Sequence, residues 1–142
     1  MSKYDTDVLE WSERQSTLLR RLAAGERVND NDLDWPNLAE EIESVGRREL
    51  RATESLIIQA LAHLMKIEAW PDSIPAARWR IEADHFAWQA RRSFTPSMRQ
   101  HIDMEELYQR ALKWLPSEID GAPPLAVPAH CPITLDELLT ES

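Results

Sequence analysis

Glycine and cysteine are both scarce in this chain of 142 residues, which holds three glycines and one cysteine. Proteins built from β-strands need glycine in many tight turns, and phosphate-binding loops need several glycines close together. The scarcity of glycine argues against both. A single cysteine excludes a disulfide bond within the chain and is typical of a reducing compartment, so we expect the protein to be cytoplasmic.

Positive charge is also in short supply. The chain has 16 Lys and Arg against 25 Asp and Glu, which gives a formal net charge of −9. Binding to nucleic acids and to anionic membranes depends on a surplus of Lys and Arg, so we expect neither as a partner. The N-terminal residues lack the apolar core of a signal peptide, and no run approaches the roughly 18 apolar residues of a membrane span.

What the sequence does contain is a series of helical patterns. Apolar residues recur at intervals of three and four, which is the spacing of one face of an α-helix. This spacing predicts helices over residues 6–24, 35–68, 75–94 and 96–115, and for the last of these a break near Asp103 is the alternative. A capping box at Thr134 starts a short helix over 135–140. Four amphipathic helices with short connections predict an all-α fold, an antiparallel four-helix bundle formed as a single helical domain over residues 1–142.

The longest predicted helix, 35–68, begins with Pro36 in its first turn and ends before Pro71. We expect its apolar stripe to face the core of the bundle; this stripe consists of Leu38, Ile42, Val45, Ala52, Leu56 and His63. Gly46 interrupts the helix and leaves two alternatives open. It marks either a close helix crossing or an exposed position in mid-helix.

The segment from residue 121 to 132 is rich in proline and in apolar residues, whereas a disordered tail is more polar. We therefore predict an extended C-terminal strap that lies over the bundle. The side chains expected to be mostly buried by it are Leu125, Val127, Ile133, Leu135 and Leu138.

Several short motifs resemble those of one bacterial family. They are Tyr4-Asp5-Thr6-Asp7 followed by Trp11, Leu33-Asp34-Trp35 leading into Asn37-Leu38-Ala39-Glu40-Glu41-Ile42-Glu43-Ser44-Val45-Gly46-Arg47, His63-Leu64-Met65-Lys66, and Cys131-Pro132-Ile133-Thr134-Leu135. In this order they make the chain similar to the family called domain of unknown function twenty-nine. The resemblance implies a small all-helical bacterial protein with no assigned activity, and it brings no catalytic residues with it.

A group of charged residues near the start of the 35–68 helix is a candidate site. Carboxylates such as Glu40 and Glu43 are stabilised at a helix N-terminus, and Glu43 and Arg47 have the spacing of an ordinary exposed ion pair. The alternative interpretation is a contact with a partner or ligand at Glu40, Glu43, Arg47 and Trp35.

Glu82 and His85 have the Glu-x-x-His spacing of carboxylate-bridged metal sites in helical bundles. Such a site needs two of these motifs, and the chain has one, although His63 offers a second imidazole. We therefore predict no metal site and keep Glu82, His85 and His63 as the candidates if one exists. His130 and Cys131 are adjacent in a segment predicted to be extended, where neighbouring side chains point to opposite faces, so they predict no catalytic pair.

The sequence contains no complete catalytic constellation, and we identify no enzymatic activity and expect no cofactor. Its acidic charge and its six tryptophans favour a protein that acts through protein–protein interaction. The sequence leaves the identity of the partner protein open, and association with further copies of the same chain is one alternative. The alternative function is a metal-dependent helical-bundle enzyme that uses the Glu-x-x-His element.

Overall fold

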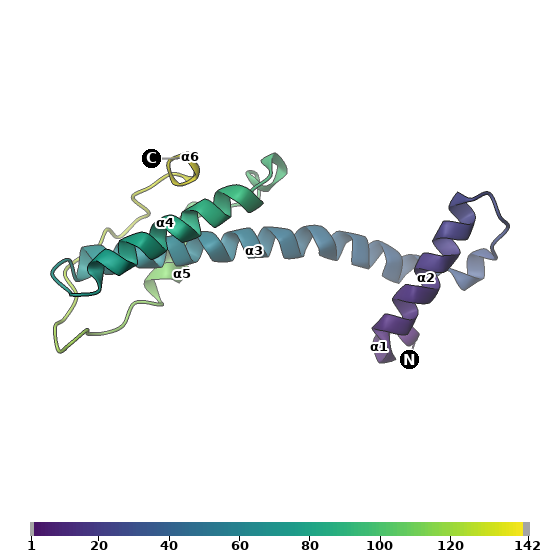
Figure 1. Ribbon diagram of the computed structural model, residues 1–142, viewed down its shortest axis with the longest axis horizontal. Coiled ribbons are helices and arrows are strands. Elements are labelled where there is room, and N and C mark those ends of the chain that lie inside the picture. The colour runs from purple at the N-terminus through teal and green to yellow at the C-terminus, as the bar shows by residue number, and fades with distance from the viewer. Residues whose placement is uncertain (1, 141–142) are drawn as a thin grey trace. The chain divides into compact units, whose positions relative to one another are not determined.

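The computed structural model describes residues 2–140, and their regular structure is helical (Figure 1). The elements are α1 Lys3–Thr6, α2 Val8–Ala23, the 3₁₀ helix η1 Asp30–Asp32, α3 Trp35–Ala69, α4 Ala76–Ser93, the 3₁₀ helix η2 Pro96–Met98, α5 Met104–Leu112 and α6 Leu135–Leu139. The predicted all-α fold class is therefore confirmed. No helix within the described residues combines the length and hydropathy needed to cross a bilayer.

The chain divides into two compact units, Met1–Arg47 and Arg48–Ser142, with the boundary inside α3. We call them unit 1 and unit 2 and describe each by itself. The single domain over residues 1–142 and the antiparallel four-helix bundle stay predictions.

Unit 1 begins with two helices, and the helix predicted over residues 6–24 corresponds to the second of them, α2. Asp7 has a non-helical backbone, with φ −153° and ψ 82°, and its side chain accepts a hydrogen bond from the backbone N–H of Glu10 at 3.1 Å. This cap satisfies a donor that a helix N-terminus leaves free, so α2 starts at Val8, two residues later than predicted. The short helix α1 was not predicted.

Unit 1 is held together by two buried side chains of α2. The indole N–H of Trp11 donates to the carboxylate of Asp34 at 2.9 Å. The amide of Gln15 accepts from the backbone N–H of Asp34 at 2.9 Å and donates to the carbonyl oxygen of Asp32 at 3.2 Å. Burial of a polar side chain is tolerated when its hydrogen bonds are made, and here those bonds fix the loop before α3 against α2.

Unit 2 has the larger core, which forms where α4 and α5 lie beside the second part of α3 (Figure 1). Its buried members are Ile57, Ile58, Ala60, Leu61, Ala62, Met65, Ala90, Leu107, Tyr108, Ala111, Leu135 and Leu138. A smaller cluster of Ala69, Trp70 and Trp79 closes the end of α3. Both tryptophans are buried, although Trp70 follows the last residue of α3 and Trp79 lies in α4.

The helix predicted over residues 96–115 is not continuous, and the alternative prediction of a break near Asp103 is confirmed. Pro96 opens a 3₁₀ turn that ends at Met98, and the α-helix begins again only at Met104. The carboxylate of Asp103 accepts hydrogen bonds from the backbone N–H groups of Glu105 and Glu106, at 3.1 and 3.2 Å. A side chain that caps a helix in this way favours a fresh N-terminus over a continued helix.

The predicted core stripe of the long helix is wrong in its first part. Ile42 and Val45 are 75% and 57% exposed, although both were expected to face the core. In unit 2 the fully buried positions of α3 include Thr53, Ile57 and Leu61. Regular spacing identifies residues that share a face, but the neighbouring elements decide which part of that face is covered.

Most of the apolar residues in the C-terminal segment pack against the core of unit 2. Leu135 and Leu138 are buried, and Val127 and Ile133 pack partly buried against the main core. The expected burial of Leu125 is wrong, because its side chain is 60% exposed while its backbone N–H donates to the carbonyl oxygen of Ala69 at 2.9 Å.

The two alternatives for Gly46 lead to a test of stability. A Cβ atom built at Gly46 meets no described atom within 4 Å, so the position is open and helical. We expect Gly46→Ala to raise the free energy of unfolding by up to about 1 kcal/mol, because alanine loses less backbone entropy in a helix. Thermal melts measure this change.

Gly25→Ala is the matched control. Gly25 is equally open but has φ +84°, where a side chain is strained, so this substitution should lower the melting temperature. A lower melting temperature for Gly46→Ala would instead indicate a close contact at this position.

Candidate functional site

The candidate residues of unit 1 separate onto two sides of α3. Residues seven apart on an α-helix lie nearly on one side, whereas residues two apart differ by about 200°. Trp35 and Ile42 therefore share one side, and Glu40 and Arg47 share the opposite side. The structure thus does not bring Trp35 together with the charged candidates.

The apolar side is a continuous row of side chains that we call the α3 stripe (Trp35, Leu38, Ile42 and Val45). Trp35 is 49% exposed, and Leu38 is partly buried. Sequence reasoning placed Ile42 and Val45 in a core, so it missed two members of this surface. The three consecutive helical spacings of 3, 4 and 3 residues were the available signal.

The charged side is a set of contacts centred on Arg47. Its guanidinium group donates to Glu40 at 2.7 Å and to the hydroxyl of Ser44 at 3.0 Å, and it lies 3.5 Å from the carboxylate of Glu43. These side chains are about half exposed, so solvent screens the ion pairs and they contribute little to stability. The predicted exposed pair of Glu43 and Arg47 is confirmed.

Glu41 lies beside the α3 stripe and ties it to the N-terminal helix. The hydroxyl of Tyr4 donates to its carboxylate at 2.7 Å, and the ring of Tyr4 packs edge-on against Trp11 with centroids 4.7 Å apart. The negative charge that accepts this hydrogen bond raises the pKa of the Tyr4 hydroxyl. The start of α3 is therefore fixed to α1 and α2 by directed contacts.

The metal candidates of unit 2 do not gather at one point. The Nε2 atom of His63 lies 2.8 Å from the carboxylate of Glu82, and its Nδ1 atom lies 2.7 Å from the carbonyl oxygen of Gln59. His85 instead contacts the side-chain amide of Gln89 at 2.7 Å. Among residues 2–140 no three potential ligands of the His, Cys, Asp or Glu type lie close enough to hold one ion.

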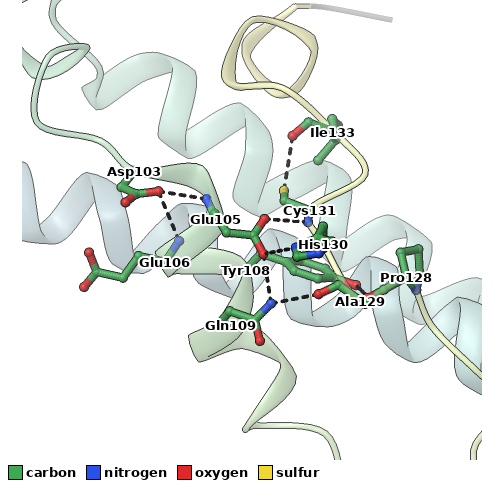
Figure 2. A network of polar contacts seen from close by, with 10 residues as sticks. All are labelled: Asp103, Glu105, Glu106, Tyr108, Gln109, Pro128, Ala129, His130, Cys131 and Ile133. Atoms are coloured by element: carbon green, nitrogen blue, oxygen red, sulfur yellow. Dashed lines mark hydrogen bonds and ion pairs between the residues drawn. The ribbon is translucent and has the colours of Figure 1, made fainter.

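A polar network joins α5 to the C-terminal segment (Figure 2). One carboxylate oxygen of Glu105 accepts from the backbone N–H of Cys131 at 2.8 Å. The other oxygen contacts Nδ1 of His130 at 3.1 Å and accepts from the amide of Gln109 at 3.0 Å. Gln109 also donates to the carbonyl oxygen of Ala129 at 2.9 Å. Three consecutive residues of the segment are thus bound by two side chains of one helix.

The electrostatics of this network favour a charged Glu105. The pKa of this carboxyl is lowered, first because the backbone N–H of Cys131 donates to it and then because Gln109 does. Burial, by contrast, raises the pKa of the Cys131 thiol, which donates to the carbonyl oxygen of Ile133 at 3.2 Å. His130 and the thiol therefore face different partners.

The centre of the attachment is the buried hydroxyl of Tyr108. It donates to the carbonyl oxygen of Pro128 at 2.5 Å, and the sulfur of Met65 lies 3.3 Å away (Figure 2). Burial raises the pKa of this hydroxyl. Its partner is 20 residues further along the chain, and no local pattern in the sequence indicates this contact.

Comparison with known proteins agrees with this fold. The family model described as "Domain of unknown function DUF29" matches residues 3–142. An alpha-helical protein of unknown function from Rhodospirillum rubrum, known from its crystal structure, is 31% identical with a TM-score of 0.70; the match covers 99% of this chain and 91% of that one. No curated protein sequence matches the chain.

The network at Glu105 predicts a pH-dependent contribution to stability. Because the folded-state pKa of Glu105 is lowered, its charged form stabilises the fold above the ordinary carboxyl pKa, and this contribution is lost as the pH falls through the lowered value. We expect Glu105→Gln to be less stable than the unsubstituted protein near neutral pH, and the difference to shrink on acidification. Urea unfolding over a pH series measures it.

Glu106→Gln serves as the control for this experiment. Glu106 is the next residue of α5 and pairs with exposed Arg110 at 2.8 Å, away from the C-terminal segment. Its substitution should have a small effect at every pH. A loss of stability in Glu105→Gln that stays constant down to acid pH would contradict a role for the charge.

Proposed function

The chain belongs to the family described as domain of unknown function DUF29, and we propose that it acts in the bacterial cytoplasm as a protein-interaction module. The observation that carries the proposal is the α3 stripe, in which Ile42 and Val45 expose most of their side chains. The compartment is supported by the single cysteine of the chain.

The stripe is unusual because unit 1 does bury other apolar side chains. Trp11, Leu18 and Leu33 are all buried. An exposed apolar row that is continuous, rather than scattered, is typical of a protein-binding surface. Burying an aliphatic side chain of this size yields roughly 1.5–3 kcal/mol of transfer free energy, so two such residues at the centre of an interface supply a substantial part of its affinity.

The charges beside the stripe favour a partner with a basic surface. Glu41 lies next to the row, and Glu40 and Glu43 lie further around the helix, where both pair with Arg47. Charges at the rim of an interface steer encounter and select partners more than they add affinity.

We propose for unit 2 that residues 121–134 act as a strap that keeps α5 against the core. The contacts of Glu105, Tyr108 and Gln109 with this segment support the proposal. The four-helix bundle expected from the sequence stays a prediction. The alternative function, a metal-dependent enzyme that uses Glu82 and His85, also stays a prediction.

Affinity capture with the full-length protein tests the interaction module. We expect Ile42→Glu to lower the recovery of bound proteins about tenfold or more, because a carboxylate at the centre of the stripe is desolvated on binding. Leu9→Glu is the control, since Leu9 is 66% exposed but lies on α2. Quantitative mass spectrometry of the captured material measures recovery, and equal recovery with both variants would refute the proposal.

Truncation after Asp120 tests the strap. The shortened protein loses the acceptor of the Tyr108 hydroxyl together with buried Leu135 and Leu138, so its melting temperature should fall by several degrees. Differential scanning calorimetry measures the change. A truncated protein with the melting temperature of the full chain would show that the segment is only a linker.

A further inference from the structure

A second exposed row of side chains lies on α4, which we call the α4 stripe (Ile81, His85, Trp88 and Arg92). Its spacings of 4, 3 and 4 residues place these residues on one side of the helix. Ile81 is 69% exposed and Trp88 is 42% exposed. The core side of α4 is a different one, since it carries the buried residues Trp79, Ala83 and Ala90.

The α4 stripe is ordered by contacts among its own members. The ring of His85 stacks on Trp88 with centroids 6.0 Å apart, and the guanidinium carbon of Arg92 lies 5.0 Å from the centroid of Trp88. An aromatic side chain held between two neighbours loses little conformational freedom when a partner binds. Tryptophan and arginine are also the residue types most often found at the centre of protein interfaces.

The two stripes carry opposite charge. The helix α4 has four arginines, Arg78, Arg80, Arg91 and Arg92, against the two carboxylates Glu82 and Asp84. The part of α3 within unit 1 has three glutamates and one arginine. The two rows also match in length, because the ten steps from Trp35 to Val45 and the eleven from Ile81 to Arg92 span about 15 and about 16.5 Å along a helix.

We propose that the α3 stripe of one copy of this chain binds the α4 stripe of a second copy. This proposal rests on the proposed function and names the partner. Ile42 and Val45 pack against Ile81 and Trp88, while Glu41, which lies beside the first row, faces the arginines beside the second. Such a contact is heterologous, because the two surfaces differ.

The net charge of −9 does not oppose this contact strongly. At physiological ionic strength the screening length is about 8 Å, so distant acidic residues of two copies repel one another only weakly. The charges adjacent to the two rows lie within this distance once the helices touch, and their attraction is retained.

Two full-length variants test the proposal. Ile42→Arg places positive charge on the α3 stripe and leaves the α4 stripe intact, whereas Trp88→Glu places negative charge on the α4 stripe and leaves the α3 stripe intact. Sedimentation velocity across a wide range of protein concentration measures association. We expect the unsubstituted protein to associate and each variant alone to show a dissociation constant raised about tenfold or more.

Mixing the two variants is the decisive step. The mixture contains one intact stripe of each kind, on different molecules, so association should return when the variants are combined. Ile74→Glu is the control, because Ile74 is 97% exposed but precedes α4, and it should associate like the unsubstituted protein.

Three results would overturn the proposal: an unsubstituted protein that is monomeric at every concentration, a variant that associates normally by itself, or a mixture that stays dissociated. A monomeric protein overturns the choice of a second copy as partner and leaves the interaction module standing. The capture experiment with Ile42→Glu decides that proposal separately, since it makes no assumption about the partner.

Discussion

The hydrogen bond from the Tyr108 hydroxyl to the carbonyl oxygen of Pro128 is the contact on which unit 2 most depends. Tyr108 is completely buried, and a buried hydroxyl without a partner is costly. Its acceptor belongs to a segment that forms no regular structure of its own. The helix that carries Tyr108 has nine residues, too few to be stable alone in water. Helix and segment therefore form together or not at all.

Unit 1 contains the same kind of contact, a hydrogen bond from a buried side chain to an irregular segment, made by different residues. There the buried amide of Gln15 binds the backbone at Asp32 and Asp34, which precede α3. In both units a polar side chain on a helix supplies the hydrogen bonds that an irregular segment lacks. A consequence in unit 1 is that the start of α3 has a fixed orientation on α2, so its apolar stripe is held outward.

Local signals in the sequence were sufficient for the longest helix. Its predicted range of 35–68 differs by one residue from the observed Trp35–Ala69, because prolines act on the backbone of their immediate neighbours. The starts of α2 and α5 also have local causes, the caps at Asp7 and Asp103. Apolar spacing alone continues across the cap at Asp103, which is why one predicted range, 96–115, covers both η2 and α5.

The partners of the site residues could not be predicted in the same way. Periodicity assigns Ile42 and Leu56 to one stripe, yet Leu56 packs against the core of unit 2 and Ile42 is exposed. Glu105 is 25 residues from His130, and His63 is 19 residues from Glu82 in the sequence. Contacts at such distances depend on how the helices pack, and no pattern within one helix contains that information.

The exposed stripe also follows from the size of unit 1. A unit of this length buries a smaller fraction of its surface than a larger domain does, and the apolar side chains that it buries are few. Natural domains retain only about 5–15 kcal/mol of net stability, so the roughly 1.5–3 kcal/mol from covering each of Ile42 and Val45 is a large increment. Under the proposed function, a partner that covers the stripe stabilises the fold of unit 1 as it binds. The proposal therefore couples binding and stability at the same side chains in the complex, whereas in the free chain these exposed side chains contribute little to the fold.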